Sequence, residues 1–259
     1  MKRMILAGIL SVAAAASNLL AQAKPPAPKS AKELDAVKAM IAAAQAGPDQ
    51  TIAAAESVIT GFADTEFKEM ALFFEARAYQ QKNDMVKAQV YGERVLEINP
   101  RNYQTTLMLG EVLAQTTREN DLDKEEKLAR SDKYLTATME NLKTAAKPNP
   151  QMADKDWDEV KQQMTAEAHS ALGLIALTRK KYDVAAAEFK TASDMDPQPA
   201  YLVRQASALQ SLGKFDDAIA LCDKVLADAQ LHPQIRQVAQ NVRAAAIKAG
   251  GKAAGSDPK

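Results

Sequence analysis

Ala185-Ala186-Ala187-Glu188-Phe189-Lys190-Thr191-Ala192 is the stretch of the sequence that says most about the fold. In it, the first alanine is followed four residues later by Phe189 and three residues after that by Ala192. Gly173 lies twelve residues before this stretch, and Pro197 follows five residues after its end. Small residues allow two helices to approach closely, and a large residue fills the space that remains between them. The spacing therefore predicts two packed helices that end before the proline.

The same spacing recurs along the chain. Ala206 precedes Ala218 by twelve residues, and Ala76 precedes Ala88 by the same interval. The separations are 34 residues from Ala76 to Gly110, 63 from Gly110 to Gly173, and 33 from Gly173 to Ala206. A period of this length is typical of stacked helical hairpins.

The composition of the 259 residues also favours an all-α protein. Alanine, the best helix former, makes up about one residue in five, whereas aromatic residues make up 5%. A β-sandwich would need more aromatic and β-branched residues. The balance of 33 basic and 33 acidic residues argues against a nucleic-acid-binding surface, and a single cysteine excludes an intramolecular disulfide or a thiolate zinc site.

These residues resemble the tetratricopeptide repeat (TPR), a helix-turn-helix unit of 34 residues. The clear units are 69–102, 166–198 and 199–232, although Gly92 and Cys222 stand where an aromatic residue is usual. The resemblance implies a right-handed superhelical α-solenoid over residues 31–249. It includes a hairpin at 31–44 and 48–62 and a capping helix at about 234–249.

Two segments depart from the repeat. The unit at about 103–147 contains a charged insertion, residues 118–127, which displaces its second helix. Met152 to Met164, with the only tryptophan, Trp157, either lengthens the next helix or forms a separate one.

The N-terminus indicates export. Residues 1–23 combine Lys2 and Arg3, a short apolar run and Ala21-Gln22-Ala23, which predicts a bacterial signal peptide cleaved after Ala23. An uncleaved membrane anchor is the alternative, although the apolar run is marginal for a helix that spans a membrane. The prolines of residues 24–30 indicate an extended linker. Residues 250–259 have almost no large apolar side chains, which predicts a disordered tail. The expected location is periplasmic or secreted, without a stable membrane span after cleavage.

Catalytic and metal-binding patterns are weak. His169 and His232 lie in different units without metal-ligand spacing, so we expect neither to hold a metal. Cys222 occupies a core slot, and the carboxylates around Trp157 are typical of a solvated helix face. We therefore expect no enzyme activity and no cofactor. An enzyme site in the irregular region 118–165 remains a weaker alternative.

The resemblance implies that a protein or peptide partner binds in the concave groove lined by the first helices. Carried across residue by residue, the groove positions are Met70, Phe73, Arg77, Gln80, Gln104, Leu107, Glu111, Gln115, Glu167, Ser170, Leu174, Thr178, Val203, Ser207 and Gln210. Family members that clamp a terminal carboxylate have cations or amides at four of these positions, which are occupied here by Phe73, Leu107, Ser170 and Val203, so the resemblance favours a mixed apolar and polar groove instead. The expected function is a protein-interaction module of the cell envelope, with an accessory subunit of an envelope enzyme or transporter as the alternative. The charged insertion 118–133 could be a partner-specific protrusion, and the oligomeric state is open.

Overall fold

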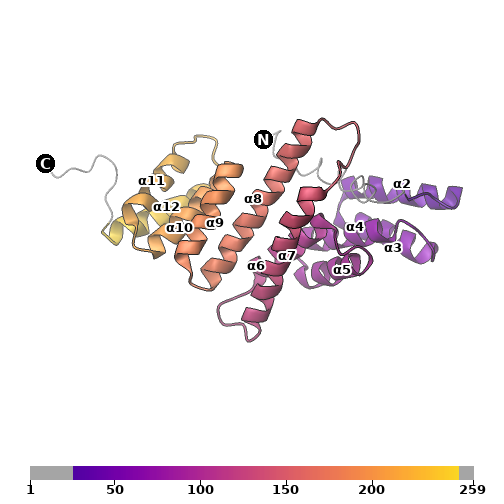
Figure 1. The fold of residues 1–259 in the computed structure, drawn as a ribbon, viewed down its shortest axis with the longest axis horizontal. Helices are drawn as coiled ribbons and strands as arrows, with labels where there is room; N and C mark the ends of the chain where they lie inside the picture. The colour runs from indigo at the N-terminus through magenta and orange to yellow at the C-terminus, as the bar shows by residue number, and fades with distance from the viewer. Residues whose placement is uncertain (1–25, 251–259) are drawn as a thin grey trace. The chain divides into compact units, whose positions relative to one another are not determined.

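The computed structural model describes residues 26–250, and all of its regular structure is helical (Figure 1). The predicted signal peptide, its cleavage site and most of the predicted tail lie outside the described residues. The all-α fold class predicted from the sequence is confirmed. The helices are α2 (Ala31–Ala46), α3 (Pro48–Gly61), α4 (Lys68–Gln81), α5 (Met85–Ile98), α6 (Tyr103–Thr116), α7 (Lys124–Thr144), α8 (Asp154–Thr178), α9 (Tyr182–Met195), α10 (Pro199–Ser211), α11 (Phe215–Leu226) and α12 (Pro233–Lys248).

The chain divides into two compact units. Within the described residues, unit 1 comprises residues 26–112 and 136–159, and unit 2 comprises residues 113–135 and 160–250. The division passes through α6, α7 and α8, so each of these helices contributes to both units.

In unit 1, helices α2 to α5 pack in chain order, each against the next. Their core joins Val37 and Met40 of α2 to Val58 of α3 and to Met70 and Phe74 of α4. Helix α4 lies between α3 and α5, and most of its side chains are buried. Because α4 has a neighbouring helix on each side, side chains on its opposite faces are buried.

In unit 2, α10 packs against α9, α11 and α12, and α11 also packs against α12. Phe189 of α9 is fully buried among alanines of α8, α9 and α10. Cys222 of α11 is buried beside Ala206, as its core slot predicts. Helix α12 is the last helix of the described residues and closes this unit through Val242 and Ala246.

The connections inside three hairpins share one geometry. Asn83, Lys180 and Gly213 have positive φ angles of 60°, 59° and 77°. The N–H of each donates to the carbonyl three residues earlier, and the next N–H donates to the carbonyl five residues earlier, over 2.8–3.0 Å. These bonds satisfy carbonyls that the helix end leaves without partners. The repeat is therefore visible in the backbone as well as in the side chains.

The two irregular segments have a clear structure. The charged insertion forms the connection 117–123 and the first turn of α7. Residues 154–164 extend the following helix, so that α8 is 25 residues long. Trp157 is buried near its start, and its Nε1–H donates to the Ala145 carbonyl oxygen over 3.3 Å.

Candidate functional site

The predicted groove residues differ widely in exposure. Some are buried in the fold: Met70, Phe73, Leu107, Ser170 and Val203. Others are half-buried: Arg77, Gln80, Gln104, Glu111, Leu174, Thr178, Ser207 and Gln210; Gln115 and Glu167 are exposed. A buried side chain stabilises the stack but offers little surface to a partner. The half-buried and exposed residues therefore remain the candidates for partner contact.

In unit 1, the predicted face of α4 is largely core. Phe73 packs with Leu72 and Val95, and Met70 joins the core cluster of α2 and α3. Arg77 donates from Nη1 to Gln80 Oε1 over 2.8 Å, which links two predicted groove residues on consecutive turns.

In unit 2, α8 and α10 are joined by a polar contact on their first-helix face. The Arg204 guanidinium donates from Nη1 to Ser170 Oγ over 2.5 Å. Ser207 lies one turn beyond Arg204, and Gln210 lies one turn beyond Ser207, so the three share one side of α10. Arg204 was not among the predicted groove residues. The i, i+3 spacing from Ser207 is the signal that could have found it.

The α8–α10 face is defined by the half-buried residues Thr178, Arg204, Ser207 and Gln210, with the buried Ser170 beneath Arg204, and it carries hydroxyl, amide and guanidinium groups. Such groups can hydrogen-bond to the main chain of an extended peptide, and an arginine can also bind a carboxylate. The Arg204 side chain is held by Ser170 before any ligand arrives. The chemistry of this face is therefore compatible with recognition of a peptide.

The histidines and the cysteine of unit 2 have structural contacts. His169 Nδ1 lies 2.7 Å from Glu188 Oε2, which ties α8 to α9. His232 precedes α12 and accepts a hydrogen bond from the Gln234 N–H. Burial raises the pKa of the Cys222 thiol to about 11, so the thiol is protonated at neutral pH. Within residues 26–250, no three histidine, cysteine or carboxylate residues are grouped as metal ligands would be.

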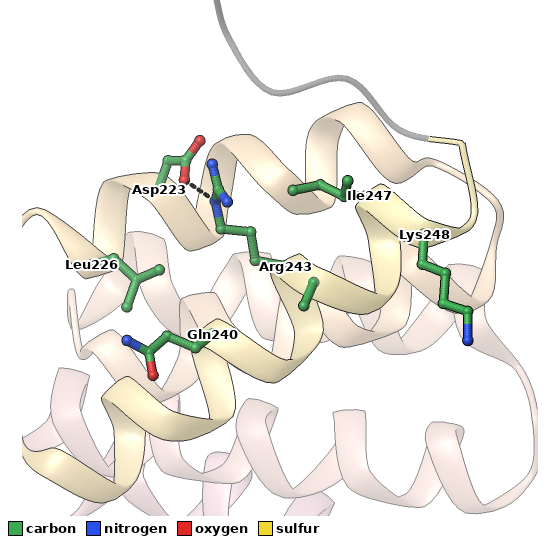
Figure 2. A pocket seen from close by; sticks show the side chains of 7 residues that line it. Asp223, Leu226, Gln240, Arg243, Ile247 and Lys248 are labelled. Carbon is green, nitrogen blue, oxygen red and sulfur yellow. Dashed lines mark hydrogen bonds and ion pairs between the residues drawn. The ribbon is translucent and has the colours of Figure 1, made fainter. Parts of the chain in front are cut away.

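A hollow of about 600 Å³ lies between α11 and α12 (Figure 2). Leu226 and Ile247 contribute apolar surface to it, and Arg243 and Lys248 contribute positive charge. Arg243 Nε donates to Asp223 Oδ1 over 2.5 Å across the two helices.

The charged insertion of unit 2 is held by ion pairs. Lys180, at the positive-φ position before α9, pairs with Glu119, and the neighbouring Arg179 lies 3.0 Å from Glu125. Lys127 on α7 pairs with both Asp121 and Asp123, at 3.3 and 2.8 Å. Exposed pairs stabilise a fold only weakly, but several pairs together restrict a loop.

Unit 1 contains a buried carboxyl group that the sequence did not single out. Glu75 on α4 is 1% exposed, and its Oε2 has no hydrogen-bond partner among the described residues. Burial raises its pKa to about 7; Glu56 on α3 adds to the rise, and Arg94 on α5 opposes it. The folded state therefore favours the protonated form of Glu75.

Because the pKa of Glu75 is raised in the folded state, the stability linked to its proton is complete below pH 4.5, its ordinary value, and is lost as the pH rises through 7. We expect the free energy of unfolding to fall by about 1–2 kcal/mol more between pH 5 and 8 in the wild type than in Glu75→Gln. Urea unfolding at each pH measures this difference. Glu97→Gln, on the exposed side of α5, is the matched control. Equal pH slopes for the wild type and Glu75→Gln would contradict the assignment.

Among residues 26–250, none of the helices has the length and hydropathy that crossing a bilayer requires.

Comparison with known proteins locates the repeat in unit 2. A family model described as tetratricopeptide repeat matches residues 170–234, from the C-terminal part of α8 to the start of α12. Among solved structures, the chain is similar to a thermophilic TPR protein of Thermus thermophilus, with 21% identity, a TM-score of 0.51, and coverage of 81% of this chain and 98% of that chain. It is also similar to the TPR2AB-domain:pHSP90 complex of yeast Sti1, with 15% identity, a TM-score of 0.29, and coverage of 83% and 97%. Comparison with curated proteins found no significant match.

These findings confirm the coarse part of the sequence prediction. The helical hairpins form an α-solenoid type of fold, and residues 170–234 carry TPR-like repeats.

Proposed function

We propose that this protein is a non-enzymatic interaction module of the bacterial cell envelope, which binds an extended segment of another protein on the α8–α10 face. The observation that carries the proposal is the contact between Arg204 and Ser170, which positions a cation on the first-helix face of the matched repeats. Ser207 and Gln210 continue this polar surface along α10. Stacked helical repeats form extended binding surfaces of this kind.

The chemistry of the face favours one class of partner segment. Hydroxyl and amide side chains can pair with peptide N–H and C=O groups whatever the sequence of the peptide. Arg204 adds selectivity for a segment that carries an acidic side chain. The envelope location is supported by the pattern of residues 1–23, whose positive start and Ala21-Gln22-Ala23 end are typical of a cleaved signal.

A photo-crosslinking amino acid at Ser207 is expected to capture a discrete partner protein in intact cells, whereas the same group at Ala220 is not. Ala220 is exposed on α11, the second helix of the hairpin, and serves as the matched position. Mass spectrometry of the product identifies the partner segment, and the chain in that product is expected to begin at Lys24.

Binding of the purified partner segment then tests the role of charge. Arg204→Glu is expected to weaken binding by about tenfold or more, and Lys224→Glu, the same charge reversal on exposed α11, is expected to have little effect. Capture from Ala220 instead of Ser207, or equal binding by both variants, would contradict the proposal. Phe73 is unsuitable for such a test because its burial makes any charged substitution a test of folding.

A further inference from the structure

The carboxyl group of Glu75, near the middle of α4, is the feature of unit 1 that the proposed function leaves unexplained. The side chain is 1% exposed, and its Oε2 has no hydrogen-bond partner among the described residues. Glu75 directly precedes Ala76 as Leu172 directly precedes Gly173, so it occupies a repeat position where another unit has a leucine. A buried carboxylate that lacks partners is costly, whereas a protonated carboxyl group carries no charge to desolvate.

Glu75 lies within the packing that joins α4 to its neighbours. On α4 it follows Leu72 by three residues and precedes Tyr79 by four, and all three are buried on one side of the helix. Leu72 packs with Val95 of α5, and Tyr79 stacks on Tyr91 of α5 with ring centroids 5.1 Å apart. A charge that appears on Glu75 is therefore enclosed by the contacts that hold α5 against α4.

The charged groups that act on Glu75 come from both neighbouring helices. Glu56 of α3 repels a negative charge on Glu75, and Arg94 of α5 attracts one. Arg94 is half-buried and lies over the Tyr91 ring, 5.2 Å from its centroid. Burial raises the pKa of Tyr79 to about 12, so its hydroxyl group stays neutral near pH 7. Glu75 is therefore the buried group of this cluster whose charge changes near neutral pH.

Other titratable groups differ from Glu75 in their place or in their partners. Both histidines, His169 and His232, belong to unit 2. Burial raises the pKa of Glu69, also on α4, but its Oε1 accepts hydrogen bonds from Asn99 and Asn102 over 2.8 and 2.9 Å. Such bonds stabilise the ionised form of a carboxyl group.

We propose that Glu75 is a pH-sensitive switch in unit 1, which keeps α4 packed between α3 and α5 while its carboxyl group carries a proton and loosens this packing when the proton is lost to solvent. Local opening returns the carboxylate to water and so recovers the cost of the buried charge. Stacked helices can open in parts, so this change does not require the whole chain to unfold. The switch requires no property of the α8–α10 face and is independent of the proposed function.

The sign of the pH dependence follows from the two states. Glu75 binds its proton more tightly in the closed state than in the open state, where its pKa returns towards 4.5. The contribution of the proton to closure is therefore complete below pH 4.5 and is lost as the pH rises through 7. Alkaline conditions open the switch, and acidic conditions close it.

Amide hydrogen exchange of the chain from residue 24 onward, corrected for the chemical exchange rate at each pH, tests this proposal. The opening constant of amides in α4 and α5 is expected to rise about ten- to thirtyfold between pH 5.5 and 8.5. Glu75→Gln has no proton to lose and is expected to abolish the rise. Glu97→Gln, at an exposed position of α5, is the matched control and is expected to retain it. Amides in α10 and α11 are expected to respond equally in the wild type and in Glu75→Gln.

Glu75→Leu keeps the proposal testable if Glu75→Gln does not fold. Leucine is the residue found at the same repeat position before Gly173, so it suits a buried site on a first helix. This variant is expected to show slow exchange in α4 and α5 at both pH values.

The neighbouring charges provide a readout that a purely structural role of Glu75 would not move. Carbon-13 NMR of the Glu75 carboxyl group, assigned by the loss of its signal in Glu75→Gln, measures the midpoint of its titration. Glu56→Gln removes a repelling charge and is expected to shift this midpoint to lower pH, whereas Arg94→Gln removes an attracting charge and is expected to shift it to higher pH.

Three outcomes would overturn the proposal. The first is an opening constant in α4 and α5 that is equal at pH 5.5 and 8.5 in the wild type. The second is a rise with pH that Glu75→Gln or Glu75→Leu retains. The third is a titration midpoint that neither Glu56→Gln nor Arg94→Gln shifts.

Discussion

Replacement of Phe189 by alanine is expected to lower the free energy of unfolding by about 3–5 kcal/mol. Phe189 is 0% exposed, and the buried residues around it are Ala176, Ala185, Ala186 and Ala208. Alanine side chains cannot extend into the space that the ring would leave, so the cavity would persist. The ring also contacts α8 and α10, so its loss weakens the packing of consecutive hairpins.

Urea unfolding followed by circular dichroism measures the change in stability. Because repeat stacks can unfold in parts, amide hydrogen exchange in α8, α9 and α10 should be measured alongside it. Phe189→Leu, which retains much of the buried volume, is expected to cost about 1–2 kcal/mol. A loss below about 1 kcal/mol for Phe189→Ala would contradict the enclosed position of the ring.

Much of unit 2 could be predicted because the relevant information is local. The small residue at 173 and the large one at 189 belong to consecutive helices, and their spacing alone indicates that they meet. The positive-φ turns at Lys180 and Gly213 follow the same period of 33 residues. At Gly92, where an aromatic residue is usual, Met108 and Leu109 from the next helix fill the space instead. The sequence pattern does not show that Met108 and Leu109 take the place of the missing aromatic ring, because this depends on how α5 and α6 pack.

The candidate sites were harder to predict because they depend on contacts between distant residues. Helical spacing places Phe73 on the same face as Arg77, but it cannot show that Val95 and Ile59 enclose the phenylalanine. The length of α8 depends on the burial of Trp157, whose indole reaches the carbonyl of Ala145 on the preceding segment. A sequence pattern also cannot show that Glu75 is buried without a partner for Oε2.

The insertion illustrates the same difficulty. Its mixture of charges is typical of a solvated segment, and the sequence alone predicts no more than that. Ion pairs from Arg179 and Lys180, more than fifty residues later, convert it into a restrained loop. Its shape is therefore a property of the folded unit and not of the local sequence.

Gly173→Ala is expected to lower the free energy of unfolding by about 2–3 kcal/mol, although alanine is normally the better helix residue by about 0.5–1 kcal/mol. A Cβ at position 173 would lie 2.5, 2.7 and 2.8 Å from Cε1, Cδ1 and Cζ of Phe189. Because the ring is fully buried, it cannot move away without displacing α9. Gly61→Ala is the matched control, since a Cβ there has no neighbour within 4 Å and is expected to leave stability unchanged or slightly higher.

The double variant Gly173→Ala/Phe189→Leu identifies the source of the loss. If the clash with the ring causes it, the smaller leucine makes room for the new methyl group. The double variant should then be more stable than the sum of the two single changes predicts, by about 1 kcal/mol or more. Strict additivity would show that the two residues act independently. A gain in stability for Gly173→Ala equal to that of Gly61→Ala would show that α8 and α9 do not approach closely at this glycine.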